Sequence, residues 1–140
     1  GGTENVHGIV GIAKALEISY RDLEHKHAHI SNLKAEMIQA LRENISGIEF
    51  NGDPEGNSLY TVLSVSFPSS DAGNMLLFNL DINGISASGG SACSSGATGG
   101  SHVINCIKPG TDRTTIRFSF GKYNTLEDIK TTIEKLRTWY

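Results

Sequence analysis

The run SGGSACSSGATGGS, residues 88–101, contains no apolar side chain larger than those of alanine and cysteine. Such a segment cannot pack a hydrophobic core, so we expect it to form a mobile surface loop. Apolar residues still make up 38% of the 140-residue chain, and charged residues make up 19%. This balance is sufficient for the core of one ordinary domain and is unlike that of a disordered chain.

The first third of the chain has helical periodicity. Apolar residues recur at three- and four-residue spacing between Val6 and Leu16, which predicts a helix. A second helix is predicted from about Asp22 to Asn44, with Gly47 as its stop signal. Its apolar stripe consists of Leu23, Ile30, Leu33, Met37 and Leu41.

After Gly47 the pattern changes to short strands that alternate with helices, which favours an α+β fold with helices on one face of a small sheet. The apolar members of a predicted strand at 60–67 are Tyr60, Val62, Val65 and Phe67. Further strands are predicted at 48–50, 85–88 and 114–120, and a short helix is predicted at 102–107. Another helix is predicted through Met75–Leu80, with Ser70 or Asp71 as its cap. The last helix begins with a Thr125/Asp128 capping box and is expected to bury Ile129, Ile133 and Leu136.

Composition argues against several classes of protein. The net charge of −3 offers no basic surface for nucleic acid or an anionic membrane. The apolar runs are far shorter than the roughly 20 residues of a membrane span, and GGTENVHG has no feature of a signal peptide. Two cysteines do not make a disulfide framework, so we expect a reducing, cytoplasmic compartment.

Cys93 lies in the middle of the Gly/Ser run, where burial is not expected. A thiol flanked by small residues on a flexible tether can reach a substrate that is held elsewhere. The thiolate is the nucleophilic form, so a base or the substrate has to help remove the proton. The residues alone leave a reactive Cys93 and an incidental exposed thiol both open. Cys106, inside the apolar run VINCI, is interpreted as a small core residue.

Arg117 interrupts the predicted strand 114–120, in which Ile116, Phe118 and Phe120 face one way. Successive side chains of a strand alternate between its two faces, so Arg117 must face the other way. Its rigid guanidinium fork suits bidentate capture of a carboxylate. An ordinary arginine on the solvent face of a half-exposed sheet is the alternative interpretation.

The run His25-Lys26-His27-Ala28-His29 raises the question of a metal site. On a helix His25 and His29 share a face and could share a zinc ion, but nothing is obviously placed to complete the site. A solvated helix face is therefore the preferred interpretation. The Gly-rich run also lacks the Lys-Ser/Thr ending of a Walker motif, which argues against a phosphate cradle.

Several stretches resemble the NifS/IscS-like cysteine desulfurases of the class V aminotransferase family. Residues 88–96, SGGSACSSG, resemble that family's active-site loop. Residues 101–103, SHV, and 115–121, TIRFSFG, resemble its "SHV … SIRFSLGR" run. Near the N-terminus, GTENV and GIVG resemble its "GTPNV … GIVG" segment. The motifs occur in the family's order and span nearly the whole chain.

The resemblance implies the C-terminal small domain of a fold-type I enzyme that uses pyridoxal 5'-phosphate (PLP). Residues 1–20 would lead out of a PLP-binding large domain, and 88–101 would be the mobile catalytic loop. Cys93 matches the cysteine that takes the substrate sulfur as a persulfide, and Arg117 matches the arginine that binds the substrate carboxylate. Thr3 matches a threonine that, in these homodimers, reaches the cofactor phosphate of the neighbouring subunit.

The implied reaction turns L-cysteine into L-alanine and delivers the sulfur to an acceptor or scaffold protein, for example in iron–sulfur cluster assembly. The family's Schiff-base lysine lies in a His-Lys motif upstream of the GTxN segment, whereas the only such pair here, His25-Lys26, lies downstream. We therefore expect the chain to be an inactive piece of a longer enzyme, with an apolar surface that the large domain would cover. Two smaller departures, the second glycine of SGG and Lys122, do not touch the implied chemistry.

Three other functions stay open. The chain could belong to a selenocysteine lyase or another class V aminotransferase-like enzyme, although a plain aminotransferase has no need of a mobile thiol. It could be a non-catalytic module that presents Cys93 to a sulfur-carrier or scaffold protein. It could also be a small metal protein built on His25, His29 and a cysteine.

Overall fold

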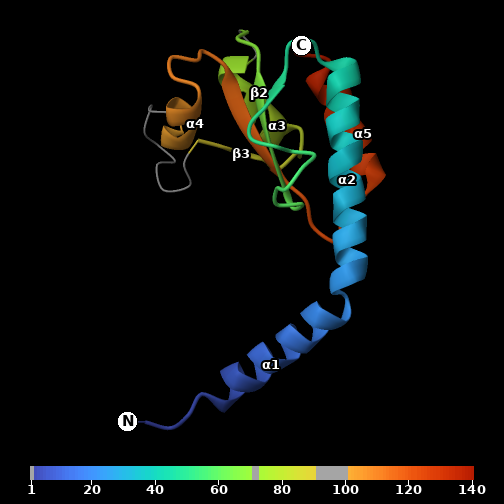
Figure 1. The fold of residues 1–140 in the computed structure, drawn as a ribbon, viewed down its shortest axis with the longest axis vertical. Helices are drawn as coiled ribbons and strands as arrows, with labels where there is room; N and C mark the ends of the chain where they lie inside the picture. Colours follow the sequence, from blue (N-terminus) through green and yellow to red (C-terminus); the bar gives the residue numbers. More distant parts are fainter. Residues whose placement is uncertain (1, 71–72, 91–100) are drawn as a thin grey trace.

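The structure is a computed structural model that describes residues 2–70, 73–90 and 101–140 (Figure 1). In chain order, the elements are α1 (Val6–Arg21), α2 (Leu23–Asn44), β1 (Glu49–Phe50), β2 (Val62–Phe67), the 3-10 turn η1 (Gly73–Met75), α3 (Leu76–Ile82), β3 (Ser88–Gly89), α4 (His102–Ile107), β4 (Thr114–Ser119) and α5 (Leu126–Leu136).

The strands form an antiparallel sheet in the order β1-β2-β4-β3. The long pair β2 and β4 makes its centre, where Leu63 lies opposite Phe118 and Val65 lies opposite Ile116. The structure thus confirms the α+β prediction, with a small antiparallel sheet and helices packed on it.

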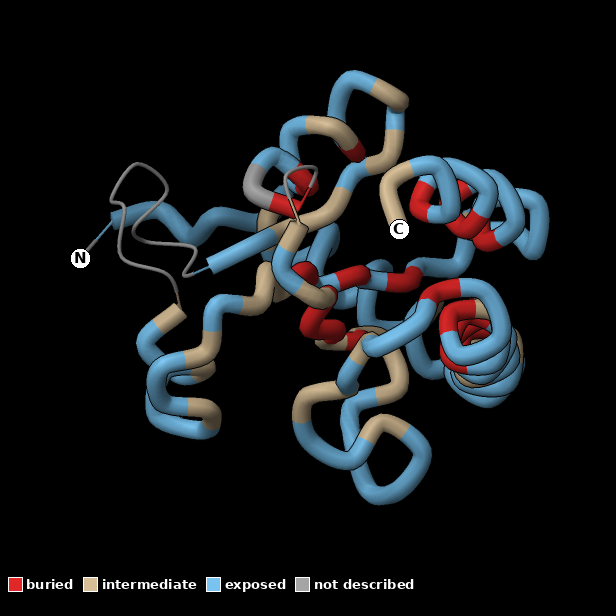
Figure 2. The backbone as a smooth tube through the Cα atoms, turned by 90° about the horizontal axis from the view of Figure 1, so that it is seen from above, coloured by how far each residue is buried: buried red, intermediate tan, exposed pale blue. Residues whose placement is uncertain are grey.

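The two faces of the sheet differ in chemistry because the strand residues alternate. The buried apolar side chains of the central strands all lie on one face, and they are Leu63, Val65, Phe67, Ile116 and Phe118. Helices α2, α3 and α5 cover this face and complete the core, and α4 lies on the other side of the sheet (Figure 1). In Figure 2 the buried residues gather where these helices meet the sheet.

Most of the predicted helical stripes are buried as expected. In α2 the buried residues include Ile30, Leu33, Met37 and Leu41, but Leu23 is 48% exposed. The reason is visible in Figure 1, where the first turns of α2 extend beyond the edge of the sheet. The predicted stripe of α5 is buried throughout, at Ile129, Ile133 and Leu136.

The prediction for β2 was wrong in its starting point and in part of its pattern. The strand begins at Val62, and its fully buried apolar residues are Leu63, Val65 and Phe67. Val62 alternates with these residues along the strand, so its side chain points away from the core, as do those of Ser64 and Ser66. Tyr60 precedes the strand and is partly buried against the core.

The segment after α3 also differs from the prediction. The strand expected at 85–88 consists of Ser88–Gly89 only, because the amide of Ile85 still bonds to the carbonyl of Leu80 and belongs to the helix end. At the other end of this region, Ser70 Oγ accepts from the amide of Gly73 at 2.9 Å, so Ser70 caps η1 rather than α3. Asp71, the alternative cap, lies outside the described residues.

Helix α1 forms where the spacing predicts it but continues to Arg21. It leads away from the rest of the molecule (Figure 1) and has no buried residue. Ile9, Ile12 and Leu16 of its apolar stripe are 56%, 73% and 55% exposed. No described helix is long and apolar enough to cross a bilayer.

Helix α5 begins with the predicted capping box. The amide of Asp128 donates to Thr125 Oγ1, and the amide of Thr125 donates to the Asp128 carboxylate. We expect Thr125→Ala to lower the free energy of unfolding by about 1 kcal/mol, because an amide at the helix start loses its acceptor. Urea denaturation of the 140-residue chain measures this loss. Thr131→Ala, at an exposed site within α5, is the matched control, and an equal loss in both variants would contradict the capping account.

Candidate functional site

The polar face of the sheet forms one wall of a hollow of about 310 Å³. Strand residues Ser64, Thr115 and Arg117 line it, together with Ser88 at the start of β3. The first turn of α4 makes the opposite wall, from Ser101 to Ile104. The hollow therefore combines hydroxyl groups, one guanidinium and one imidazole, on the side of the sheet that does not face the core.

Arg117 occupies the middle of this face. In the strand register it lies between Ser64 of β2 and Ser88 of β3, and the hydroxyl of Ser88 lies 3.4 Å from its carbonyl. Its side chain is exposed, which confirms that it faces away from the core. The guanidinium has no hydrogen bond or ion pair with any residue that the structure describes, whereas those of Arg42 and Arg113 are both paired. Arg117 is therefore available to bind an anion that enters the hollow.

The Gly/Ser segment begins and ends at this hollow. Gly90 and Ser101 are both lining residues, and Ser101 also caps α4 by accepting from the amide of Ile104 at 3.4 Å. Cys93 lies between them, outside the described residues. The structure therefore brings both flanks of the predicted catalytic loop to the predicted carboxylate-binding arginine.

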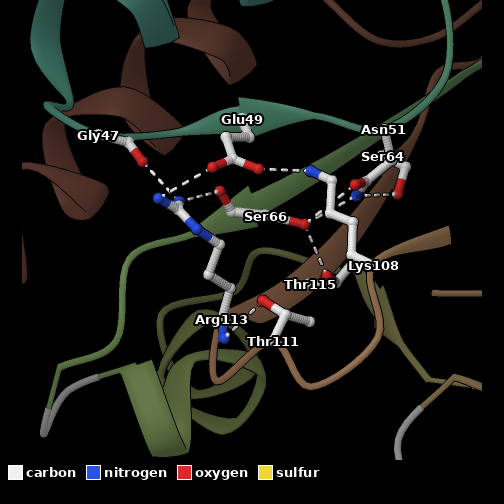
Figure 3. Close-up of polar contacts among 9 residues, drawn as sticks. All are labelled: Gly47, Glu49, Asn51, Ser64, Ser66, Lys108, Thr111, Arg113 and Thr115. Carbon is white, nitrogen blue, oxygen red and sulfur yellow. Dashed lines mark hydrogen bonds and ion pairs between the residues drawn. The ribbon is translucent and has the colours of Figure 1, made fainter. Parts of the chain in front are cut away.

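A network of hydrogen bonds supports the wall of the hollow that the sheet forms (Figure 3). The side chain of Ser66 is fully buried, and its Oγ lies 2.9 Å from Thr115 Oγ1 and 2.9 Å from Asn51 Nδ2. Asn51 Nδ2 also donates to Ser64 Oγ at 3.1 Å. A buried hydroxyl is costly unless it is hydrogen-bonded, so these contacts stabilise the positions of Ser64 and Thr115 beside Arg117.

Thr3 is not brought to the hollow within one chain. It is an exposed residue that precedes α1, whose N-cap is Asn5. Figure 1 shows the N-terminal end of α1 far from the sheet that carries Arg117. Of the three predicted site residues, the structure places Arg117 in the hollow, places Thr3 away from it, and does not describe Cys93.

The interpretation of Cys106 as a core residue was wrong, because the structure places its side chain at the surface of α4. None of the residues of α4 is buried, and Val103 and Ile107 are also exposed. The apolar run VINCI forms a helix over the polar face of the sheet, where no hydrophobic core exists to receive it.

The histidine run does not form a metal site with other described residues. His29 Nε2 lies 3.0 Å from the carbonyl of Asn124, and the ring of His27 packs on that of Tyr60. In the part of the chain that the structure describes, no group of three or more His, Cys, Asp or Glu side chains could hold a metal ion. The metal-protein alternative thus gains no support from the geometry.

A comparison with known protein families shows which family the chain belongs to. The profile of the class V aminotransferases matches residues 1–131. The chain belongs to the class V aminotransferase family. Its curated relatives include the putative cysteine desulfurase IscS 1 of Bacillus subtilis (strain 168), which is 41% identical over 133 residues, 93% of this chain and 35% of that protein.

A second relative of this class V chain is the cysteine desulfurase IscS of Dictyoglomus turgidum. It is 36% identical over 98% of this chain and 36% of that protein. Among solved structures, a NifS-like protein is 30% identical with a TM-score of 0.76, and covers 99% of this chain and 34% of its own. A NifS-like protein from Rickettsia africae has the same TM-score at 23% identity, over 99% of this chain and 35% of its own, and shares the fold. The class V chain spans about a third of the length of these proteins.

Class V aminotransferases are in general PLP-dependent enzymes, and PLP is held through a Schiff base to a lysine. The lining of the hollow tests whether this chain could hold the cofactor by itself. Hydroxyls, His102 and Arg117 line it, but no lysine does. As lined by the described residues, this hollow therefore offers no lysine to which PLP could be attached.

Proposed function

We propose that this chain is part of a PLP-dependent cysteine desulfurase that converts L-cysteine to L-alanine and an enzyme-bound persulfide on Cys93. The observation that carries the proposal is the position of Arg117. Its guanidinium, which has no hydrogen bond or ion pair with a described residue, lines the same hollow as both flanks of the segment that contains Cys93. The matched relatives named cysteine desulfurase support the same activity.

Arg117 would hold the substrate carboxylate. A guanidinium can donate two parallel hydrogen bonds to a carboxylate, and this fixes both the position and the orientation of the amino acid. The hydroxyls of Ser64, Ser88 and Thr115 would surround the bound carboxylate. The side chain of bound cysteine would then have a defined place relative to the two flanks of the loop.

Cys93 would accept the sulfur. Two residues, Ser91 and Ala92, lie between Gly90 and Cys93. At about 3.5 Å per residue, the three steps from Gly90 to Cys93 can span at most roughly 11 Å. In the transfer, the carbon–sulfur bond of the substrate breaks and a sulfur–sulfur bond forms to Cys93 Sγ. Of the two thiol hydrogens, one ends on the substrate carbon, which becomes the methyl group of alanine, and the other stays on the persulfide. The carbon is reduced and the transferred sulfur is oxidised, so no outside oxidant is needed.

The cofactor and the remaining partners would come from outside this chain. PLP, bound by residues of the large domain, supplies the electron sink that makes the carbon–sulfur bond of cysteine breakable. Thr3, which precedes α1 and does not line the hollow, would contact the cofactor phosphate of the neighbouring subunit in a homodimer. The persulfide would be delivered in the cytoplasm to an acceptor or scaffold protein, for example for iron–sulfur cluster assembly.

The experiment that tests this proposal uses the full-length protein with PLP and L-cysteine. We expect alanine and persulfide sulfur in equal amounts. A keto acid in place of alanine would assign the chain to another class V enzyme. Faster turnover of L-selenocysteine with no turnover of L-cysteine would assign it to the selenocysteine lyases, and binding of a sulfur-carrier protein without any turnover would favour the non-catalytic module.

A further inference from the structure

Helix α4 makes one wall of the hollow yet is weakly attached to the sheet. None of its residues is buried, although its first turn lines the hollow that contains Arg117. Within the described residues, no side chain of His102–Ile107 makes a hydrogen bond or ion pair with another element. The position of this wall therefore depends on how the chain is held just after the helix.

A charged clamp holds that end of α4 (Figure 3). Lys108, the C-cap residue of α4, donates from Nζ to Glu49 Oε2 at 2.6 Å. Arg113 Nη2 lies 3.1 Å from the other carboxylate oxygen, Oε1. A single carboxylate on the edge strand β1 thus contacts both ends of the turn that joins α4 to β4.

The clamp is also fixed to the body of the sheet. Arg113 Nη1 donates to the carbonyl of Gly47 at 2.6 Å, just ahead of β1. The side chains of Lys108 and Arg113 are only 25% and 24% exposed, against 45% for Glu49. Because partial burial reduces screening by solvent, these two ion pairs fix the positions of Lys108 and Arg113 relative to Glu49 more firmly than fully exposed ion pairs would.

We propose that Glu49 is a positioning residue for substrate binding: through Lys108 and Arg113 it sets the distance between the first turn of α4 and Arg117. The inference rests on the proposed function, because the hollow is taken to receive the carboxylate of L-cysteine. Glu49 itself touches no substrate. Its effect is on the width of the hollow and hence on the KM for L-cysteine rather than on the chemical step.

The charge state needed for this role is present at neutral pH. The hydrogen bond from Lys108 is the main cause that lowers the pKa of Glu49, and the positive charges of Lys108 and Arg113 lower it further against the effect of desolvation. Because the folded-state pKa is lowered, the contribution of the clamp is present at neutral pH and is lost as the pH falls through that value.

The test compares Glu49→Gln, Lys108→Met and the double variant in the full-length enzyme. Glu55→Gln is the matched control, since Glu55 pairs with Arg42 in an exposed ion pair on the loop after β1. Two readouts are taken: hydrogen exchange of the amides at 102–108, which needs no activity, and the separate values of KM and kcat for L-cysteine. We expect faster exchange and a KM raised about fivefold in each clamp variant, with kcat within twofold.

The double variant should be no worse than Glu49→Gln alone, because that substitution already breaks the ion pair with Lys108. Unchanged exchange in Glu49→Gln relative to Glu55→Gln would overturn the anchoring role, whatever the enzyme does. Faster exchange with an unchanged KM, or with a loss in kcat alone, would overturn the link to substrate binding. If the wild-type enzyme makes no alanine from L-cysteine, the proposed function fails, and the substrate-binding role of Glu49 fails with it, while exchange still decides whether Glu49 anchors α4.

Discussion

Replacing Cys93 by serine is expected to stop the formation of alanine from L-cysteine in the full-length enzyme, with a loss of at least about a thousandfold. A serine hydroxyl has nearly the size of the thiol but is a far weaker nucleophile toward sulfur and forms no persulfide. The substitution leaves the proposed carboxylate site at Arg117 unchanged, so substrate should still bind. The measurement is the rate of alanine release under saturating L-cysteine.

Cys106→Ser provides the matched control. Cys106 is an exposed thiol on α4, so it is open to reagents and to non-specific sulfur exchange. Its substitution should leave the rate within twofold. Equal activity of the wild type and Cys93→Ser would make Cys93 incidental, and it would move the assignment to another lyase or transferase of the class V family.

Replacing Arg117 by lysine should raise the KM for L-cysteine by about 30-fold. Lysine keeps the positive charge but loses the planar fork, so one of two parallel hydrogen bonds to the carboxylate is lost. The side chain has no other described partner, and Arg117 lies on the polar face, so the fold should not suffer. Steady-state kinetics across L-cysteine concentrations measures the effect.

Arg137→Lys is the control for this substitution. Arg137 is the C-cap residue of α5, on the opposite side of the sheet, and its substitution should leave KM unchanged. A substrate analogue without the carboxylate gives a second check. It should be used equally poorly by the wild type and Arg117→Lys, and a preserved difference between them would show that Arg117 acts on something other than the carboxylate.

Much of the fold follows from local sequence patterns. The three- and four-residue spacing of Ile30, Leu33 and Met37 predicts the buried stripe of α2, and the Thr125/Asp128 box marks the first turn of α5. The alternation around Arg117 predicts its face correctly, because a strand that buries Ile116 and Phe118 has to expose the residue between them.

Other features depend on tertiary contacts that a local pattern does not contain. Cys106 has apolar neighbours in the sequence, but α4 lies over the polar face of the sheet. Its exposure therefore follows from the position of α4 and not from the local sequence. Lys34 is only 5% exposed although it is charged, because it donates to Ser58 Oγ and to the carbonyl of Leu59. The local sequence around a lysine does not show that hydrogen-bond acceptors from another part of the chain will lie beside it.

The residues around Arg117 were also missed, although a signal for them exists. Ser64, Ser66 and Thr115 are hydroxyl residues at alternate strand positions, opposite the apolar set. Such a pattern indicates that one face of the strand is polar. Which hydroxyl groups lie next to one another depends on which strand pairs with it. The pairing of Ser64 with Arg117 and of Ser66 with Thr115 comes from the antiparallel register of β2 and β4.

We propose that the hollow at Arg117, together with the segment 91–100 whose flanks Gly90 and Ser101 line it, forms a site where sulfur passes from L-cysteine to Cys93. The most direct measurement is the mass of the peptide that contains Cys93 after one turnover with L-cysteine that carries a heavy sulfur isotope. We predict a persulfide on Cys93 that contains the labelled sulfur, with one equivalent of alanine released. Labelled sulfur on Cys106, or alanine released with no label on Cys93, would contradict this account.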